Sequence, residues 1–455
     1  MNPKRKRVVL LVDDKKRDLM VAALIAHQLD ERGIDCLLEP LEAYRGALAA
    51  HRPHLMVFNH LVSSHLVAWS KRLASMGVLT AVLLNEGLCY DDEERDYNAG
   101  KHHKGAHIDY FFCWNEPLKK ALLRYGFGAR TQIEVVGPAR YDYYSPPWSR
   151  VFQGYRWPGS GRRPKVLACS NFGLAKFFKA PRSEGKKLLA PWTNRIPIYS
   201  DWWGLIEMHY RAQQRFLEHL EALARSRRFD LLVRPHPRED LDEYRNWLKN
   251  LPADVQAEVR MDPDSNITSL VLGCDLHIGC ENCNTTMESW IAGKPTVELV
   301  FQRHPVFYNP DVAALSPNCE RPEDLVEIVE HELSNPEQAR YRAGRHAHLA
   351  KWCASPSGKA TVRIAEVIAE RLAREPEPDW TKLGLADRRR GLKLKGLQRL
   401  GKAYHYKPFV KLRSRLLGGK HKLKAYVYDK GVTPKDVRKA RSLIETRLSQ
   451  RSSSA

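Results

Sequence analysis

The sequence predicts an α/β protein made of two Rossmann-like domains, followed by a basic helical tail. Short apolar, β-branched runs alternate with helix-like segments over most of the chain, as in parallel sheets covered by helices on both faces. With 455 residues, the chain exceeds what one ordinary hydrophobic core organises. A stretch rich in Pro, Gly, Ser and aromatic residues, Tyr141 to Arg163, interrupts the alternation and is typical of an interdomain linker.

The first domain is expected to span residues 1–150 and to lie on the acceptor side of the protein. Its six predicted strands are Val8–Val12, Asp35–Glu39, His54–Asn59, Val78–Leu84, Ile108–Trp114 and Ile133–Val136. The first helix, Asp18–Arg32, has apolar residues at helical spacing and ends before Gly33, a frequent helix stop.

The second domain is expected to span residues 151–375. Its predicted strands are Lys165–Cys169, Asp230–Val233, Asp275–Gly279 and Thr296–Val300. Predicted helices are Leu205–Arg225, Leu241–Leu248, Thr286–Ala292, Pro322–Leu333, Pro336–Trp352 and Lys359–Arg374. Between Cys169 and Leu205 we expect a long loop that contains Trp192, Trp202 and Trp203, and loops of this length are often functional.

Composition favours a cytoplasmic protein. No apolar stretch reaches the roughly 18 residues that a membrane-spanning helix needs. The basic N-terminus leads into an apolar run that stops at Asp13-Asp14 without a small-residue cleavage site, so it predicts a first strand instead of a signal peptide. Nine cysteines, an odd number without framework spacing, fit a reducing compartment.

The positive charge is concentrated in the tail, expected at residues 376–455. The chain has a formal net charge of +21, and the segment from Trp380 to Ala455 alone holds 22 Lys and Arg against 4 Asp and Glu. The rest of the chain is therefore almost neutral. Whatever the basic charge binds is expected to be bound by the tail, not by the body.

Two motifs follow predicted strands in the second half of the chain. The first is Arg234-Pro235-His236-Pro237, and the second runs from Asn282 through Asn284-Thr285-Thr286 and Glu288 to Ser289. In open α/β sheets, ligands bind outside the carboxyl ends of the strands. Arg and His donate to phosphate oxygens, and the flanking prolines fix the backbone around His236.

The Thr-Thr segment has two compatible interpretations. It opens a predicted helix, whose N–H groups and dipole favour an anion, while Glu288 is able to accept from ribose hydroxyls. Thr285 and Glu288 also have the spacing of an ordinary capping box. Cys280-x-x-Cys283 hints at a metal, but no second pair has zinc-site spacing, so we expect no metal.

Together these motifs resemble the donor domain of GT-B-type glycosyltransferases, especially the bacterial surface carbohydrate biosynthesis family for capsule and lipopolysaccharide. That branch includes Kdo transferases and CDP-polyol phosphotransferases. The N-terminal segments Val12-Asp13, Asn85-Glu86-Gly87 and Gly137 to Asp142, with Ser170-Asn171-Phe172, are similar to landmarks of the family. The resemblance implies two Rossmann-like domains facing a cleft, no tightly bound cofactor, and a nucleotide-sugar donor, with CMP- or CDP-linked donors favoured.

The resemblance assigns a nucleotide-binding role to a set of residues in the second domain: Arg234, His236, Pro237, Asn284, Thr285, Thr286, Glu288, Ser170 and Asn171. Many relatives have Ser-Ser where this chain has Thr285-Thr286, which preserves the hydroxyl groups. Glycosyl transfer also needs a group that deprotonates the acceptor hydroxyl. Strand-end position gives the order Glu86, Asp142 and then Asp13, although helix capping or linker anchoring also explains the last two.

The tail combines basic, apolar and aromatic residues, which suits an interfacial helix on anionic lipid. The candidate membrane-binding residues are Arg388, Arg389, Arg390, Lys393, Lys395 and Arg399. Further along, Tyr404, Tyr406, Phe409, Val410, Leu416 and Leu417 interleave with Lys and Arg. No nucleic-acid module is recognisable, so a membrane is favoured over nucleic acid, and a protein partner stays open.

The sequence therefore predicts a cytoplasmic glycosyltransferase held on the inner face of the membrane. It would transfer a CMP-linked, Kdo-like ulosonic acid to a glycan or lipid-linked acceptor. A CDP-glycerol or polyol-phosphate transferase is the closest alternative, and a nucleotide-sugar epimerase is the next. A nucleic-acid-binding protein with an α/β scaffold is the alternative of another class.

Overall fold

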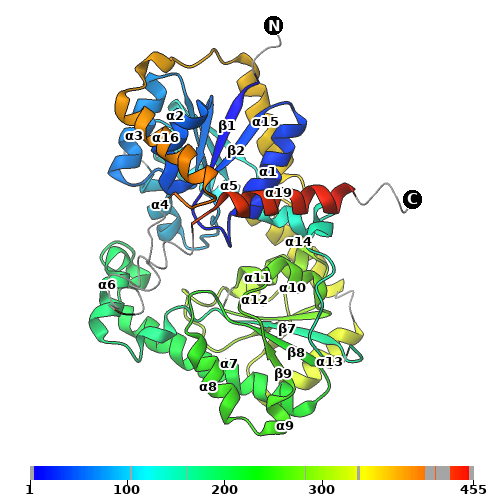
Figure 1. Ribbon diagram of the computed structural model, residues 1–455. Coiled ribbons are helices and arrows are strands. Elements are labelled where there is room, and N and C mark those ends of the chain that lie inside the picture. The colour runs from blue at the N-terminus through cyan, green and yellow to red at the C-terminus, as the bar shows by residue number, and fades with distance from the viewer. Residues whose placement is uncertain are drawn as a thin grey trace. The chain divides into compact units, whose positions relative to one another are not determined.

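The computed structural model describes residues 5–102, 105–159, 161–281, 283–335, 339–404, 416 and 431–449 (Figure 1). The chain divides into two compact units. Met1–Asp142 and Lys351–Ala455 form the first unit, and Tyr143–Ala350 forms the second. The expected boundaries at residues 150 and 375 differ from this division, because the chain after residue 350 rejoins the N-terminal unit.

The first unit is built on a parallel sheet of six strands in the order β2-β1-β3-β4-β5-β6. The strands are β1 (Arg7–Val12), β2 (Asp35–Pro40), β3 (Leu55–Phe58), β4 (Leu79–Leu83), β5 (Tyr110–Cys113) and β6 (Gln132–Val135). All six predicted strands are confirmed, and their ends move by only one or a few residues. β2 and β3 lie on opposite sides of β1, so the order in which strands are added to the sheet reverses at β1 and β3.

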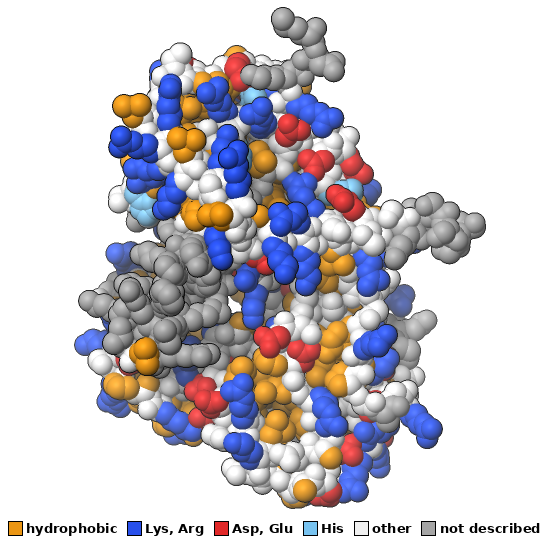
Figure 2. All heavy atoms as spheres, in the orientation of Figure 1, with side chains coloured by type: hydrophobic (Ala, Val, Ile, Leu, Met, Phe, Trp, Pro, Cys, Tyr) orange, Lys and Arg blue, Asp and Glu red, His pale blue; other side chains and the backbone are white. Residues whose placement is uncertain are grey.

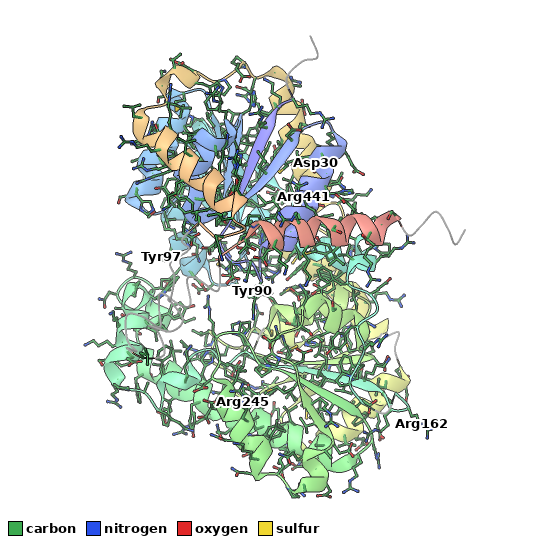
Figure 3. The ribbon with its side chains drawn as sticks, viewed as in Figure 1. Asp30, Tyr90, Tyr97, Arg162, Arg245 and Arg441 are labelled. Carbon is green, nitrogen blue, oxygen red and sulfur yellow. The ribbon has the colours of Figure 1, made fainter. Side chains whose placement is uncertain are left out.

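Helices cover both faces of this sheet (Figure 1). They are α1 (Leu19–Glu31), α2 (Tyr44–His51), α3 (Ser64–Ser75), α4 (Asp92–Gly100), α5 (Glu116–Arg124), α15 (Ala360–Arg374), α16 (Leu385–Arg399) and α19 (Pro434–Ser449). The late helices pack on early ones: α15 and α19 on α1, and α16 on α2. Figure 3 shows Arg441 of α19 beside Asp30 of α1, with which it forms an ion pair.

The second unit has a parallel sheet of six strands in the order β12-β11-β10-β7-β8-β9. The strands are β7 (Lys165–Cys169), β8 (Asp230–Arg234), β9 (Val259–Met261), β10 (Leu276–Cys280), β11 (Thr296–Leu299) and β12 (Asn318–Cys319). The four predicted strands are confirmed, whereas the short edge strands β9 and β12 carry too few residues to give a pattern. This strand order is that of a Rossmann sheet, with its switch point between β7 and β10.

The helices of the second unit are α6 (Arg182–Thr193), α7 (Trp202–Ser226), α8 (Leu241–Asn250), α9 (Ala253–Gln256), α10 (Ile267–Gly273), α11 (Asn284–Ile291), α12 (Pro310–Ala313) and α13 (Leu325–Ser334). α14 (Ala339–Cys353) leads back to the first unit. Residues 336–338 of the predicted helix Pro336–Trp352 lie outside the described residues.

The prediction of a long loop before Leu205 is wrong in part. α6 lies within it, and Trp202 and Trp203 belong to the start of α7. A proline inside α6, Pro191, hides the helical pattern in the sequence, while burial of Leu189 and close packing of Gly185 against Ile206 hold the helix in place. The expected fold class, two Rossmann-like parallel sheets with helices, is confirmed. Among the described helices, none is both long and apolar enough to cross a bilayer.

Candidate functional site

Three neighbouring strands of the second sheet bring the predicted nucleotide-binding residues to one edge. β10, β7 and β8 lie side by side and run parallel, so their carboxyl ends coincide. Ser170 and Asn171 follow β7, the Arg234–Pro237 segment ends β8, and Thr285 and Thr286 follow β10. The structure therefore gathers two motifs separated by about 50 residues in the sequence at the switch point of the sheet.

A buried carboxylate, Glu239, organises the loops at this edge. Its Oε1 accepts hydrogen bonds from Ser170 Oγ and from the Phe172 N–H, each 2.8 Å long. Its Oε2 accepts from Gln213 Nε2 at 3.3 Å and from the hydroxyl of Tyr244. Burial raises the pKa of Glu239, and the four donors oppose that rise. The carboxyl group thus fixes the loop after β7 through hydrogen bonds to Ser170 and Phe172.

Ser170 transmits this support to the Arg-Pro-His-Pro segment. Its hydroxyl accepts a hydrogen bond from the His236 N–H at 3.1 Å while it donates to Glu239. Ser170 is only 2% exposed. Ser170 therefore positions the backbone of His236.

The His236 ring has a defined tautomer. The N–H of Arg238 donates to His236 Nδ1 at 3.2 Å, so Nδ1 carries no proton and the neutral ring holds its proton on Nε2. A half-buried imidazole in this state presents one N–H donor. Arg234 lies deeper, where its Nη1 donates to the carbonyl of Asp262 at 3.1 Å and burial lowers its pKa. Pro237 is exposed next to them.

The capping box predicted as the structural alternative does not form. α11 begins at Asn284 after Cys283, and no side chain caps it. Thr286 Oγ1 donates instead to Glu298 Oε2 at 3.2 Å, and Glu288 accepts from the hydroxyl of Tyr144 at 2.7 Å. The first N–H groups of a helix have no partner within the helix and favour an anion, although the backbone of Thr285 already hydrogen-bonds Cys283 at the start of α11.

Glu288 and Thr286 are therefore held within the unit. Glu288 is 4% exposed and Thr286 is 1% exposed, so neither is on the surface of the site. Thr285 is also buried, with its Oγ1 3.2 Å from Cys283 Sγ. Burial raises the pKa of Cys283 to about 11, so this thiol stays protonated at neutral pH. Within the part of the chain that the structure describes, no group of His, Cys, Asp and Glu could hold a metal ion.

Sequence reasoning missed a buried acid at the same edge, Glu281. It directly follows β10 with a positive φ of 51°, and neither carboxyl oxygen has a hydrogen-bond partner among the described residues. His209 Nδ1 lies 3.8 Å from its Oε2 and also has no hydrogen-bond partner among the described residues. Asn171 Nδ2 donates to the Glu281 carbonyl at 3.1 Å and ties this residue to the loop after β7.

Burial dominates the protonation of this pair. It raises the pKa of Glu281 well above its ordinary value, and the nearby acids Glu239 and Glu298 raise it further. Burial also lowers the pKa of His209 to about 3, so both side chains are neutral near pH 7. No spacing in the sequence distinguishes Glu281 from an ordinary strand-end glutamate, because its unusual property is the lack of a partner.

The first sheet has a polar edge of its own. Arg17 Nη2 lies 3.2 Å from Asp13 Oδ2, and its Nη1 lies 3.1 Å from Glu86 Oε1. Arg17 Nε is also 2.5 Å from Asp18 Oδ1. Asp13 follows β1 and Glu86 follows β4, so the structure brings together two of the three predicted catalytic carboxylates around one guanidinium group.

The third predicted catalytic residue, Asp142, has a different role. It is 2% exposed and accepts hydrogen bonds from the N–H groups of Ala360 at 3.0 Å and Thr361 at 2.7 Å. The hydroxyl of Thr361 donates to it as well, at 2.7 Å. Asp142 therefore anchors the start of α15.

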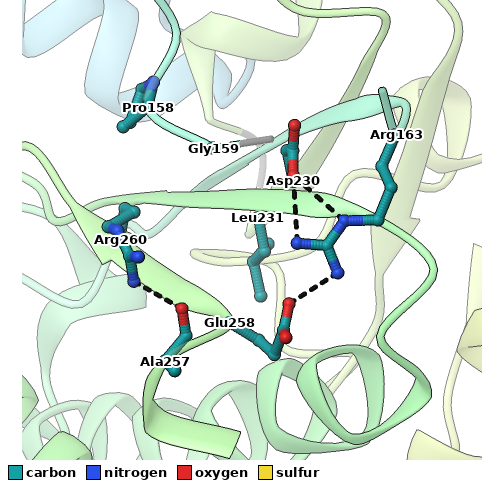
Figure 4. Close-up of a pocket in the computed structure, with 8 residues that line it drawn as sticks. All are labelled: Pro158, Gly159, Arg163, Asp230, Leu231, Ala257, Glu258 and Arg260. Atoms are coloured by element: carbon teal, nitrogen blue, oxygen red, sulfur yellow. Dashed lines mark hydrogen bonds and ion pairs between the residues drawn. The ribbon is translucent and has the colours of Figure 1, made fainter. Parts of the chain in front are cut away.

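A hollow of about 180 Å³ lies at the opposite edge of the second sheet, at the amino end of β8 (Figure 4). Its charged groups satisfy one another. Arg163 lies 3.1 Å from Asp230 and 2.6 Å from Glu258. Because ligands of Rossmann sheets bind at the carboxyl ends of strands, this hollow is not part of the candidate site.

The predicted membrane-binding residues lie on α16, whose inner face is not free. Leu394 belongs to the core of the first unit, and Gly391 packs closely against Ala49 of α2. Exposed residues form the outer face: Arg388, Arg389, Lys393, Lys395 and Arg399, with Leu385 and Leu392. Arg390 is partly buried, 3.7 Å from Asp387. Figure 2 shows Lys and Arg side chains with apolar ones among them over this part of the unit.

The aromatic residues predicted further along the tail are described only in part. Tyr404 packs against the core of the first unit, and Leu416 is 73% exposed. Tyr406, Phe409, Val410 and Leu417 lie outside the described residues.

No protein-family model and no curated protein matches this chain. Solved structures similar to it include a putative UDP-N-acetylglucosamine 2-epimerase from Listeria monocytogenes, at 13% identity over 83% of this chain and 99% of that chain, with a TM-score of 0.49. HepE from Anabaena in complex with UDP-glucose is 11% identical over 81% and 99%, with a TM-score of 0.42. Sucrose-phosphate synthase from Thermosynechococcus elongatus is 12% identical over 81% and 100%, with a TM-score of 0.44. At these identities the likeness is one of chain fold.

Proposed function

We propose that this protein is a glycosyltransferase that uses a nucleotide-activated sugar to build a bacterial surface polysaccharide. One observation carries the proposal. At the switch point of the second sheet, His236 follows β8 and the start of α11 follows β10, on either side of β7. Histidine side chains and helix starts both supply N–H donors, which the phosphate groups of a nucleotide require.

The surroundings of these donors favour a nucleotide over a free anion. Glu239 and Ser170 hold the His236 backbone rigidly, so the donor is positioned before a ligand arrives. Beside it, the neutral Glu281 and His209 provide polar groups that suit hydroxyls better than phosphates. A phosphate flanked by sugar hydroxyls is the structure of a nucleotide sugar.

The donor we favour is a CMP-linked ulosonic acid of the Kdo type, with a glycan or lipid-linked acceptor. This choice is supported by the resemblance of the His-Pro and Thr-Thr motifs to cytidine-nucleotide enzymes. A CDP-glycerol or polyol-phosphate donor is the alternative within the same resemblance. In both cases the phosphates would meet His236 and the start of α11.

The test is a thermal-shift screen of the full chain against CMP, CDP, UDP and GDP. A ligand that binds only the folded state stabilises it by about 2.7 kcal/mol at 100 times its Kd. We expect the cytidine nucleotides to raise the Tm most, and His236→Ala to abolish that rise. His331→Ala changes an exposed histidine on α13 and is the matched control.

Two outcomes would contradict the proposal. One is the absence of a shift with all four nucleotides. The other is an equal shift in wild type and His236→Ala, which would mean that the nucleotide binds elsewhere. A larger shift with UDP than with CMP or CDP would retain nucleotide binding and reject the cytidine donor.

The acceptor side is proposed to lie in the first unit, where Asp13 and Glu86 meet around Arg17. A transferred sugar needs its acceptor hydroxyl oriented and deprotonated, and carboxylates at a sheet edge orient hydroxyls. Asp142 is not retained among these residues, because it is occupied at α15.

We also propose that the outer face of α16 binds the anionic inner surface of the cytoplasmic membrane, where lipid-linked acceptors are found. Exposed Leu385 and Leu392 lie between arginines and lysines on that face. Apolar side chains in a basic frame suit the headgroup region of anionic lipid.

A further inference from the structure

Two neighbouring strand ends of the first sheet leave polar side-chain atoms buried without a hydrogen bond among the described residues. β1, β3 and β4 are adjacent and parallel. Asn59 Oδ1 and His60 Nδ1 follow β3, and Asn85 Nδ2 follows β4, and none of these atoms has a partner among the described residues. Proteins rarely bury unpaired polar groups, and those that persist concentrate at functional sites.

These atoms lie beside the Arg17 cluster. Leu10 of β1 pairs with Val57 of β3, and continuing that register by three positions brings Asp13 opposite His60. Asn85 directly precedes Glu86. The edge therefore holds two kinds of side chain. The charged ones form ion pairs with one another, and the neutral ones have polar atoms without a partner among the described residues.

The paired groups are poorly suited to accept a proton from a substrate. Arg17 donates to one oxygen of Asp13 and to one oxygen of Glu86. His60 differs, because it makes no hydrogen bond in the described structure. It is half-buried with Nδ1 enclosed, which leaves Nε2 as the nitrogen that a substrate reaches.

The charges around His60 come from four elements: Asp13 after β1, Arg17 before α1, His65 on α3 and Lys101 after α4. Burial is the main cause that lowers its pKa, so the ring is neutral near pH 7 and free to take a proton. Asp13 opposes that lowering and would stabilise the imidazolium ion once it forms.

We propose that the edge formed by Asp13, Asn59, His60 and Asn85 binds a sugar hydroxyl of the acceptor, with His60 as the general base. This inference rests on the proposed glycosyltransferase function. Unpaired amide donors and acceptors match the mixed hydrogen bonding of a hydroxyl, in contrast to the pure donors that a phosphate needs.

The proposed step is balanced. The acceptor O–H gives its proton to His60 Nε2, and the oxygen lone pair forms a bond to the anomeric carbon of the donor. The bond between that carbon and the phosphate oxygen breaks, and its electrons leave with the nucleotide. The imidazolium ion then returns its proton to water.

The experiment measures nucleotide release from CMP-Kdo by the full chain, with water or a Kdo-terminated glycolipid as acceptor. We expect His60→Ala to lower kcat by at least about 100-fold, the usual share of a general base. The Tm shift with CMP should be unchanged, because it reports the second unit. Added imidazole should restore part of the rate to His60→Ala, and the acidic limb of the pH–rate profile should disappear.

His27→Ala, at a partly exposed histidine on α1, is the matched control and should retain full rate. A His60→Ala enzyme with wild-type kcat, or one that imidazole does not rescue, would overturn this inference. If wild type neither shifts with CMP nor releases nucleotide, the proposed function fails first. If wild type shifts with CMP and also releases nucleotide, a retained rate in His60→Ala rejects His60 as the general base and leaves the proposed function standing.

Discussion

At the scale of single residues, two buried glutamates at one sheet edge differ in their hydrogen bonds, and this difference distinguishes a structural side chain from a candidate ligand-binding one. Glu239 has four donors and holds loops in place. Glu281 has no donor within the described part of the chain, has a positive φ and is as deeply buried. An unpaired buried carboxyl group costs free energy that packing elsewhere must offset, which is the pattern expected of a ligand-binding side chain.

This difference predicts a pH-dependent gain in stability for Glu281→Gln. The pKa of Glu281 is raised in the folded protein, so above pH 4.5 the unfolded chain releases a proton that the folded protein keeps. Wild-type stability should fall as pH rises from that point, by up to about 1.4 kcal/mol per pH unit. Glutamine removes this loss, so we expect the variant to exceed wild type at pH 7–8 and to match it near pH 4 in urea unfolding.

Glu327→Gln, at an exposed position on α13, is the control and should follow wild type at every pH. If Glu281→Gln is no more stable than wild type at pH 8, the carboxyl group has found a partner in solution.

The sequence predicted single residues where a motif marks them and missed residues that only their surroundings make unusual. His236 and the Thr pair stand in recognisable strings at strand ends, and the structure brings them together. His60, His209 and Glu281 have no such string, because an absent hydrogen bond is a property of the fold. The hydrogen bonds of Asp142 could not be predicted from the sequence, because its partners, Ala360 and Thr361, lie more than 200 residues away.

At the scale of elements, α16 depends on two glycines in different settings. A Cβ on Gly391 would lie 3.0 Å from Ala49 Cβ and 3.1 Å from the Ala50 nitrogen, whereas one on Gly396 would meet nothing within 4 Å. The first glycine therefore allows α16 to approach α2, and the second is a surface position.

Matched substitutions test this contact. We expect Gly391→Leu to lower the free energy of unfolding by about 1–3 kcal/mol, because the added side chain meets backbone that cannot retreat. Gly396→Leu should be neutral or stabilising by up to about 1 kcal/mol, since it replaces a poor helix former at an open site. Chemical unfolding of both variants measures the difference. Equal losses would show that α16 is held by its flanking segments and not by this contact.

Strand prediction succeeded because buried parallel strands have continuous apolar runs, as at Leu55–Phe58 and Leu79–Leu83. Helix prediction failed where tertiary packing outweighs pattern. α6 contains a proline and was missed, whereas the predicted helix Thr286–Ala292 is confirmed as α11, which begins two residues earlier and without the capping box. At α11, Thr286 donates to Glu298 of the next strand and Glu288 accepts from Tyr144, which lies 144 residues away, so neither side chain caps the helix.

At the scale of the whole molecule, the chain after residue 350 completes the first unit instead of extending the second. The sequence placed residues 351–375 in the second domain. The packing of α15 on α1, which joins this segment to the first unit, has no signature in the local sequence. The described helices of the tail, α16 and α19, likewise pack on helices of the first unit. Leu383 and Leu394 are buried in its core, and the buried Asp387 forms an ion pair with Arg72. A cut after Asp379 would remove these side chains, so the tail is better probed by surface changes in the full chain.

The last prediction concerns the outer face of α16. Reversing three exposed charges, Arg388→Glu, Arg389→Glu and Lys395→Glu, should weaken binding of the full chain to phosphatidylserine-containing vesicles at least about 100-fold, because each basic residue near an anionic surface contributes about 1 kcal/mol. A matched variant, with exposed Lys186, Lys187 and Lys249 of the second unit changed to Glu, alters net charge equally and should bind nearly as wild type. Cosedimentation at low and physiological salt measures both, with phosphatidylcholine vesicles as the neutral surface.

Equal weakening by the two variants would mean that net charge alone attracts the protein. Undiminished binding of the α16 variant would move the membrane contact away from this helix.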